Sequence, residues 1–278
     1  MSESDIIEAT EARLAGGGPV TRRRIEEDLR SLGVEPGSTL LVHSSLSSIG
    51  WVCGGAQTVI YALEEVVRPF GTLAMPTHTS QLSDPAGWRN PPVPESWCEI
   101  IRQTLPAFDP ELTPTLGMGA IPETFRSQTE VLRSVHPHVS FAAWGEGAMG
   151  VVGEHGLDYG LGDDSPLARL YDADARVLLL GVGYAVNTSF HLAEYRADFP
   201  RRRVVDTGGP VMIDGHRRWK WFEDVDINSE DFDEIGRAFE KKFRREILTG
   251  VVGLAETRLF RMRDCVDFAV RWMEQHRR

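Results

Sequence analysis

Apolar residues recur at helical spacing in the amino-terminal segment. Ile25, Leu29 and Leu32 share one face of a helix, and Gly33 follows them as a stop signal. Residues 1–33 therefore predict one or two helices.

The next elements form a strand–helix–strand unit. Thr39–His43 (TLLVH) is a short β-rich run typical of a buried strand, and Gly71–Met75 (GTLAM) is a second one. Between them, residues 44–55 form a loop rich in Ser and Gly, and Ala56–Phe70 carries apolar residues on one helical face. This order predicts two parallel strands joined by a right-handed crossover.

The middle of the chain contains a long irregular segment and the most apolar run. Residues 76–118 are rich in Pro, with one short helix expected near Glu95–Leu105, and a segment of this kind is typical of a functional loop. Residues 131–144 predict further short strands. The run RVLLLGV (Arg176–Val182) predicts the central strand, and a helix is expected at about Thr188–Ala197.

The last third of the chain changes character. Residues 201–226 contain β-rich runs around Asp214-Gly215, which predicts a hairpin with a type I′ turn. Asp231–Leu248 and Arg263–Gln275 predict charged helices that close the fold. Because no linker interrupts the pattern, residues 1–278 are expected to form a single domain of the α/β class. Its predicted architecture is an α/β sandwich with a mixed central sheet and an added antiparallel hairpin.

The charge of the chain narrows the choice of partner. With 41 acidic and 30 basic residues, the formal net charge is −11. An acidic surface repels the phosphates of nucleic acids and attracts polycations, so no nucleic-acid partner is expected. Many proteins are acidic for solubility alone, and charge by itself therefore identifies no ligand.

Hydropathy and cysteine usage bear on the compartment. No apolar run reaches the roughly 18–20 residues that cross a bilayer, and the first residues lack the apolar core of a signal peptide. Cys53, Cys98 and Cys265 are odd in number and form no CxxC motif. We therefore expect a cytoplasmic protein with reduced thiols and no membrane partner.

The Ser/Gly-rich loop after the first strand is a candidate anion site. Ligands of open α/β sheets bind at the carboxyl ends of strands, and unpaired N–H groups at a helix start favour phosphate. The loop resembles neither a Walker loop nor a Rossmann fingerprint. An ordinary surface loop would have the same composition, so both interpretations stay open. The candidate binding residues are Ser44, Ser45, Leu46, Ser47, Gly54 and Gly55.

A second candidate is His191, in the first turn of the helix that follows the apolar run. A neutral imidazole at a helix start is suited to act as a general base. Glu194 lies three residues further on, on the same helical face, and could orient the ring. A histidine bonded to backbone, with Glu194 on a solvated face, is the alternative interpretation.

Two further stretches carry polar side chains. Strand alternation would put Asp224 and Asp226 on one side of the predicted hairpin, where carboxylates can bind ammonium groups or polarise a histidine; an exposed acidic turn is the alternative. A second stretch is Arg133-Ser134-Val135-His136-Pro137-His138. Its arginine could bind a phosphate, and His136 could line a cleft. The HxH spacing suggests a metal, but no acidic ligand lies nearby in sequence, so no metal site is expected.

Taken together, these stretches resemble one family, the aminoglycoside 3-N-acetyltransferases, also called the antibiotic N-acetyltransferases. The similar segments follow the family order from about residue 20 to residue 270. They are LLVHSSLSSIGWVCGG (Leu40–Gly55), GTLAMPTHT (Gly71–Thr79), LSDPAGW (Leu82–Trp88), RNPPVPESW (Arg89–Trp97), LTPTLGMG (Leu112–Gly119), RSVHPHVSFAAWG (Arg133–Gly145), SPLARLYDADARVLLLGVGYAVNTSFHLAE (Ser165–Glu194) and the Asp224/Asp226 pair.

The resemblance implies a fold unlike the GNAT acetyltransferases and transfer of an acetyl group from acetyl-CoA to the 3-amine of an aminoglycoside. It implies that the Ser/Gly loop and the turn Met75–Thr79 hold the coenzyme, with Arg133 and Ser134 as further candidates. It places His191 at the reacting centre and the late acids in the aminoglycoside pocket. As the acid partner of His191, Asp226 and Asp224 are preferred to Glu194.

The expected mechanism is a direct attack on the thioester. His191, polarised by an acid, removes a proton from the amine, and Thr77 is the candidate donor to the oxyanion. Glu194 and His136 are expected to line the acceptor pocket with Asp224 and Asp226. The alternatives are an N-acetyltransferase for another amine, a metal-dependent hydrolase built on histidines, and a non-catalytic polyamine-binding protein. A monomer or a homodimer fits the sequence equally well.

Overall fold

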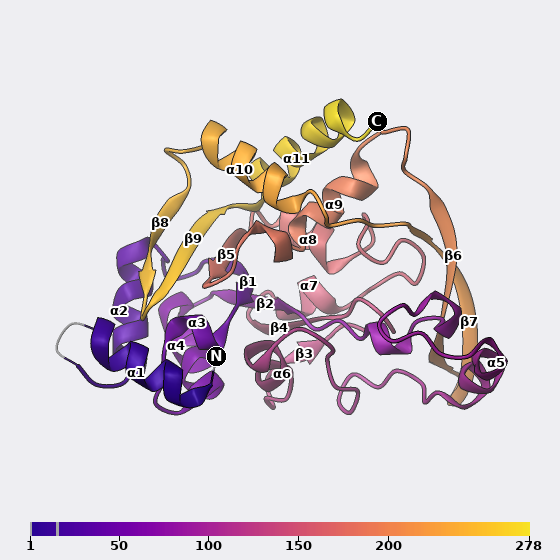
Figure 1. Ribbon diagram of the computed structural model, residues 1–278, viewed down its shortest axis with the longest axis horizontal. Helices are drawn as coiled ribbons and strands as arrows, with labels where there is room; N and C mark the ends of the chain where they lie inside the picture. Colours follow the sequence, from indigo (N-terminus) through magenta and orange to yellow (C-terminus); the bar gives the residue numbers. More distant parts are fainter. Residues whose placement is uncertain (1, 15–16) are drawn as a thin grey trace.

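A seven-stranded mixed sheet forms the centre of the protein, and a separate two-stranded hairpin extends from it (Figure 1). The computed structural model describes residues 2–14 and 17–278, so Ala15 and Gly16 within the predicted amino-terminal helices lie outside the described residues. The order of the sheet is β3-β4-β2-β1-β5-β9-β8. The strands are β1 (Thr39–Ser44), β2 (Thr72–Pro76), β3 (Leu132–Arg133), β4 (Phe141–Gly145), β5 (Arg176–Leu180), β8 (Leu248–Val252) and β9 (Ala255–Arg261).

The predicted strand–helix–strand unit is confirmed. Strand β1 pairs in parallel with β2 and also with β5, and helix α4 (Gly55–Val67) connects β1 to β2 along the chain. The remaining pairs of the sheet are antiparallel. The mixed α/β class expected from the sequence is therefore correct.

Helices cover both faces of the sheet because the inner strands alternate apolar side chains between two cores. Leu40 and Val42 pack with the core on one face, while Leu41 packs with the core on the other. Helices α2, α4 and α6 supply the first core, and α7 to α11 supply the second. The remaining helices are α1 (Glu3–Arg13), α2 (Arg22–Leu32), α3 (Leu46–Ile49), α5 (Glu95–Thr104), α6 (Ala120–Arg126), α7 (Ala148–Val152), α8 (Pro166–Asp172), α9 (Ser189–Arg196), α10 (Phe232–Lys242) and α11 (Met262–His276).

Two expectations about the sheet need correction. The most apolar strand, β5, lies beside the centre, and β1 holds the middle position. The helix expected to reach Leu248 ends at Lys242, and β8 and β9 add two strands that the sequence did not predict. The segment LTGVV of β8 contains Gly and β-branched residues, which disfavour a helix, and the β-branched residues suit a strand.

The hairpin expected in the last third of the chain is confirmed. Strands β6 (Val204–Ile213) and β7 (His216–Val225) are joined by Asp214 and Gly215, whose φ angles are 49° and 73°. Positive φ at both turn positions is the signature of the type I′ turn.

The irregular segment after β2 packs against this hairpin. Phe108 donates its backbone N–H to the Pro210 carbonyl at 3.0 Å, and the Arg217 guanidinium donates to the Leu105 carbonyl at 2.9 Å. Helix α5 consequently lies beside β7 at the far end of the molecule from α1 (Figure 1). Within the described residues, no helix combines the length and apolar character needed to span a bilayer.

Candidate active site

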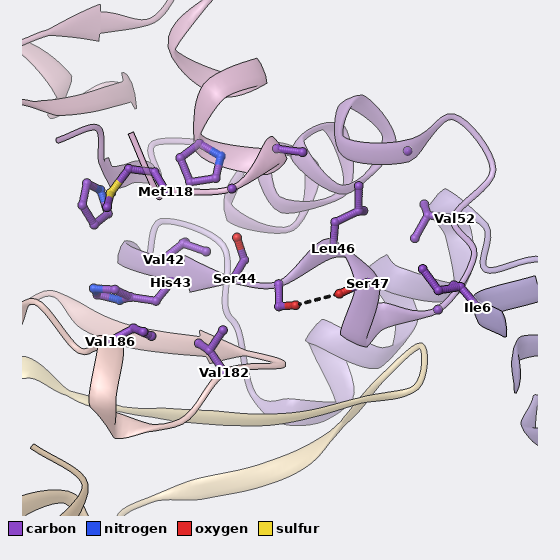
Figure 2. A pocket seen from close by; sticks show the side chains of 18 of the residues that line it. Ile6, Val42, His43, Ser44, Leu46, Ser47, Val52, Met118, Val182 and Val186 are labelled. Carbon is purple, nitrogen blue, oxygen red and sulfur yellow. Dashed lines mark hydrogen bonds between the residues drawn. The ribbon is translucent and has the colours of Figure 1, made fainter. Parts of the chain in front are cut away.

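A cavity of about 820 Å³ opens at the carboxyl end of β1, the middle strand of the sheet. Its wall combines the end of β1, the short helix α3, the start of α4 and the segment 117–120 that leads into α6. His43 and Met118 lie at one end of this cavity, and Ile6 and Val52 lie at the other (Figure 2). The cavity is therefore elongated, with β1 along its floor.

The Ser/Gly residues singled out from the sequence all line this cavity. They are Ser44, Ser45, Leu46, Ser47, Gly54 and Gly55. The Ser44 hydroxyl is buried without a hydrogen-bond partner among the described residues, whereas the Ser45 hydroxyl accepts from Ser48 at 2.9 Å. The wall thus offers an unused hydroxyl in a position closed to bulk water.

Two helix starts face the same cavity without side-chain caps. Helix α4 begins after Gly54, whose φ of 86° suits glycine, and α6 begins after Gly119. A Cβ at Gly54 would lie 2.4 Å from the Thr58 hydroxyl, so a side chain at this position would clash unless Thr58 moved. The first N–H groups of a helix lack intrahelical partners and attract anions. Among the described residues that line this cavity, none is Lys or Arg, so an anion there would depend on main-chain and hydroxyl donors.

His191 and Glu194 form a close pair on helix α9. The Nδ1–H of His191 donates to the Oε2 of Glu194 at 2.5 Å, and Glu194 is only 1% exposed. A carboxylate only accepts, so the proton of the neutral ring lies on Nδ1 and the Nε2 lone pair is left for another partner. The sequence-based preference for Asp226 or Asp224 as the acid in contact with His191 is therefore wrong, because the i, i+3 spacing on one helix makes Glu194 the neighbour.

The two late acids lie in different environments. Asp224 is half-buried and accepts from the Tyr195 hydroxyl and the Val225 backbone N–H, and burial raises the pKa of its carboxyl group. Asp226 lies just beyond β7, is exposed and pairs with Arg203 at 2.8 Å. The two carboxylates therefore have no hydrogen-bond partner in common.

Thr77 and Arg133 belong to a buried network behind the cavity. Thr77 is fully buried, and its hydroxyl lies 3.2 Å from the hydroxyl of Ser140. Arg133 donates to the carbonyls of Thr77 at 2.7 Å and Thr113 at 2.6 Å, and burial lowers its pKa to about 10. Neither side chain lines the cavity, so their expected contacts with the coenzyme and the oxyanion are corrected: Arg133 binds main-chain carbonyls, and the Thr77 hydroxyl meets the side chains of Ser140 and Arg133.

Ser134 and His136 are likewise internal. The Ser134 hydroxyl accepts from the Phe141 backbone N–H and donates to Nδ1 of His155, both at 2.9 Å. His136 is fully buried, and its Nδ1 accepts from the backbone N–H groups of His138 and Val139 at 3.1 Å. The expectations of coenzyme contact for Ser134 and substrate contact for His136 are therefore corrected. Within residues 2–14 and 17–278, no group of three or more candidate ligands could hold a metal ion.

His43 is a site residue that sequence reasoning missed. It lines the cavity, is 5% exposed, and its Nε2 accepts the backbone N–H of Thr188 at 3.0 Å. Burial lowers the pKa of His43 to about 3, so the ring is neutral and its proton lies on Nδ1. That Nδ1–H is buried and has no partner among the described residues. Its position at the end of a buried strand, directly before the serines, was the available signal.

Thr188 links this histidine to the helix that carries the His191–Glu194 pair. Its carbonyl accepts the backbone N–H of His191 at 3.0 Å, and the side chain of Thr188 also lines the cavity. Burial lowers the pKa of His43 and of His78, an imidazole in the segment after β2, to about 3. The His43 end of the cavity is thus the end connected to the His191–Glu194 pair.

Comparison with known proteins identifies the family. The family model described as "Aminoglycoside 3-N-acetyltransferase" matches residues 41–274. The chain belongs to this family. A relative in Bacillus subtilis, the SPbeta prophage-derived aminoglycoside N(3')-acetyltransferase-like protein YokD, is 48% identical over 91% of this chain and 92% of its own.

Solved structures of the family share the fold. The crystal structure of YokD superposes with a TM-score of 0.93 at 46% identity, covering 99% of this chain and 98% of that one. AAC-IIIb, solved as a binary complex with CoASH, has a TM-score of 0.83 at 31% identity over 93% of this chain and 97% of its own. AAC-VIa, solved with sisomicin bound, has a TM-score of 0.84 at 30% identity over 93% of this chain and 98% of its own.

Proposed function

We propose that this chain transfers the acetyl group of acetyl-CoA to the 3-amine of an aminoglycoside. The observation that carries the proposal is the His191–Glu194 pair, joined through Thr188 to an elongated cavity with two uncapped helix starts. Family membership, the CoASH held by AAC-IIIb and the sisomicin held by AAC-VIa support the two substrates. The whole chain, residues 1–278, acts as one transferase domain.

The coenzyme lies along β1 in this proposal. Its pyrophosphate is met by the free N–H groups at the starts of α4 and α6, which bind anions without a cationic side chain. Its pantetheine arm follows the Ser44–Ser47 wall toward His43, an arrangement supported by the elongated shape of the cavity. The thioester then reaches the wall formed by Thr188, and His191, which does not itself line the cavity, lies behind Thr188 through its backbone contact.

His191 acts as the general base. Glu194 accepts the Nδ1–H and holds the ring, so Nε2 takes a proton from the 3-ammonium group, directly or through a water molecule. The neutral amine attacks the thioester carbon, its nitrogen–carbon bond forms, and the carbonyl electron pair moves to oxygen. The first proton passes from His191 to solvent, and Nε2 then takes the second proton that the attacking nitrogen loses as the new bond forms. On collapse the carbon–sulfur bond breaks, the protonated His191 gives this second proton to the CoA thiolate, and a neutral amide is left. A positioned base of this kind accelerates a reaction on the order of 100- to 10,000-fold.

His43 supplies the donor to the oxyanion, in place of Thr77. Its Nδ1–H is oriented by the Thr188 contact and is unpaired, which suits a group that binds charge only as the reaction proceeds. An unpaired buried donor costs about 1–3 kcal/mol in the free protein. A donor aimed at the developing oxyanion lowers the barrier by about 3–4 kcal/mol.

Asp224 binds an ammonium group of the acceptor. One of its oxygens accepts from Tyr195 and Val225, and the carboxylate charge attracts a cation. The net charge of −11 favours the approach of a polycation to the molecule.

The test is release of free thiol from acetyl-CoA with a panel of aminoglycosides, followed by location of the acetyl group in the product by NMR. We expect transfer to the 3-amine. Absence of thiol release with every aminoglycoside, while another class of amine is acetylated, would reject the acceptor. Acetylation at a different amine would reject the regiochemistry alone.

A further inference from the structure

The carboxylate that holds His191 is itself held by a residue near the end of the chain. Arg277, which follows helix α11, donates through Nη1 to the Oε1 of Glu194 at 2.6 Å. The same oxygen accepts the backbone N–H of Asn228 at 2.8 Å. The two oxygens of Glu194 are therefore divided, one for His191 and one for Arg277 and Asn228.

Arg277 is locked in place by several further contacts. Its Nε donates to Asp231 at 2.8 Å, its Nη2 donates to the Asn228 carbonyl at 2.8 Å, and its guanidinium lies 5.3 Å from the centre of the Phe199 ring. The side chain is 12% exposed. Burial alone would lower the pKa of Arg277, but the hydrogen bonds to Asp231 and Glu194 outweigh it and raise the pKa. Arg277 is thus an internal cation rather than a solvated surface residue.

The charge of Arg277 explains how an ionised Glu194 is kept in the interior. A buried carboxylate is unfavourable unless a cation and hydrogen bonds compensate it. Arg277 supplies the cation, and its planar fork fixes the carboxylate in one orientation. The match to the family model ends at residue 274, so this support comes from outside the matched segment.

We propose that Arg277 is a positioning residue for the acetyl transfer, acting through Glu194 to hold His191 in its reactive orientation. This inference rests on the proposed function. It assigns a role in catalysis to the segment that follows α11, which touches neither the cavity nor, in this proposal, either substrate.

The expected pH effect follows from the charges around His191. Glu194 lies on the same helix, Asp224 comes from the hairpin, and Asp231 precedes α10; His43 and His78 are neutral neighbours from β1 and the segment after β2. Removing Arg277 leaves Glu194 and Asp231 without their cation, which stabilises a proton on His191. The acidic limb of the kcat profile should therefore move to higher pH.

The experiment compares Arg277→Gln with Arg278→Gln, a matched loss of charge at the exposed neighbouring position. We expect Arg277→Gln to lower kcat by about 10-fold or more, as part of the contribution of the base is lost, while the KM for acetyl-CoA changes little. Its acidic limb should shift upward, and Arg278→Gln should match the unaltered protein. An unchanged kcat and pH profile in folded Arg277→Gln would overturn the proposal.

Two additions keep the outcome decisive. If Arg277→Gln fails to fold, Arg277→Lys serves as the second variant, because it keeps the positive charge. We expect it to fold and to have an intermediate kcat. Full activity of Arg277→Lys would show that the charge is sufficient and that the planar guanidinium group is not needed. NMR titration of the His191 ring measures the same coupling without turnover. If the unaltered protein transfers no acetyl group but the titration midpoint still rises in Arg277→Gln, the proposed function fails and the Arg277–Glu194 coupling stands.

Discussion

Thr188 donates its backbone N–H to the Nε2 of His43 at 3.0 Å, which ties the end of the middle strand to the residue before helix α9. Because an N–H group only donates, this contact settles which nitrogen of His43 carries the proton. The same contact also fixes Thr188, whose carbonyl accepts the backbone N–H of His191. His43 can therefore influence catalysis either through its free Nδ1–H or through Thr188.

Two substitutions of His43 separate these roles. The amide of Asn reaches the position of Nδ1 and keeps a donor there, whereas the amide of Gln reaches the position of Nε2 and keeps only the Thr188 contact. If the Nδ1–H meets the oxyanion, His43→Gln should lower kcat about 100- to 1,000-fold and His43→Asn should lower it far less. Initial rates at saturating acetyl-CoA measure this. The reverse order would assign His43 to holding Thr188 alone.

Replacement of His191 by Asn should remove the base and keep the shape of the helix. We expect kcat to fall about 100- to 10,000-fold while the Kd for CoA, measured by calorimetry, stays within about twofold. Glu194→Gln should lower kcat less than His191→Asn does. The His191 ring then keeps a hydrogen-bonding neighbour but loses the negative charge that favours its protonated form. Near-normal turnover of folded His191→Asn would exclude His191 from the mechanism.

Asp224 and Asp226 should differ in their effect on the acceptor. Asp224→Asn should raise the KM for an aminoglycoside about tenfold, the equivalent of about 1.4 kcal/mol, because a charged contact to an ammonium group is lost. Asp226→Asn removes an exposed pair with Arg203 and should leave that KM within about twofold. Equal effects of the two substitutions, measured by steady-state kinetics, would contradict the assignment of Asp224.

Replacing Ser44 tests whether the Ser44–Ser47 wall of the cavity contacts the coenzyme. The Ser44 hydroxyl is buried without a partner among the described residues, so Ser44→Ala should leave the free energy of unfolding unchanged or slightly increased. If the hydroxyl contacts the coenzyme, the same variant should raise the KM for acetyl-CoA by about 3- to 10-fold. Ser45→Ala serves as a comparison, because its hydroxyl already bonds to Ser48 and its loss should lower stability. An unaltered KM in Ser44→Ala would remove this residue from the binding wall.

Buried histidines should make the fold sensitive to acid. Burial lowers the pKa of His43 and His78 to about 3 and of His138 and His155 to about 4, all below the ordinary value of 6.5. Between about pH 6 and pH 4 the unfolded chain binds protons that the folded chain does not, so stability falls as pH falls, by up to about 1.4 kcal/mol per pH unit for each histidine. Urea unfolding at pH 7 and pH 5 measures the loss. A flat profile would show that these rings titrate normally in the folded state.

Local patterns predicted the part of the fold nearest the cavity. The β1–loop–α4–β2 unit follows from one β-rich run, one glycine-rich turn and one amphipathic helix, all within about 40 residues. The hairpin was predictable from Asp214-Gly215, because the Asp-Gly pair strongly favours a type I′ turn. The sequence did not indicate strands β8 and β9 because their charged surroundings resemble a helix and because β5, the strand that pairs with β9, lies about 80 residues earlier.

The site was predictable to the extent that its parts adjoin in sequence. The Ser/Gly wall and His191 follow strands whose carboxyl ends meet at one edge of the sheet. Thr77 and Arg133 are close to this edge in sequence, yet their side chains turn into the interior, and no sequence pattern reports that direction. The contact of Arg277 with Glu194 joins positions 83 residues apart and depends on how α11 packs against α9.

The absence of Lys and Arg from the described cavity wall has a consequence for mutation. If main-chain amides at the starts of α4 and α6 hold the pyrophosphate, no missense change can delete a donor other than by introducing proline or distorting the backbone. Coenzyme recognition would then tolerate drift in the surrounding side chains, and its affinity would depend weakly on ionic strength. In the proposed acceptor site, by contrast, one missense change at Asp224 removes the charged contact, so changes in acceptor preference should arise there first.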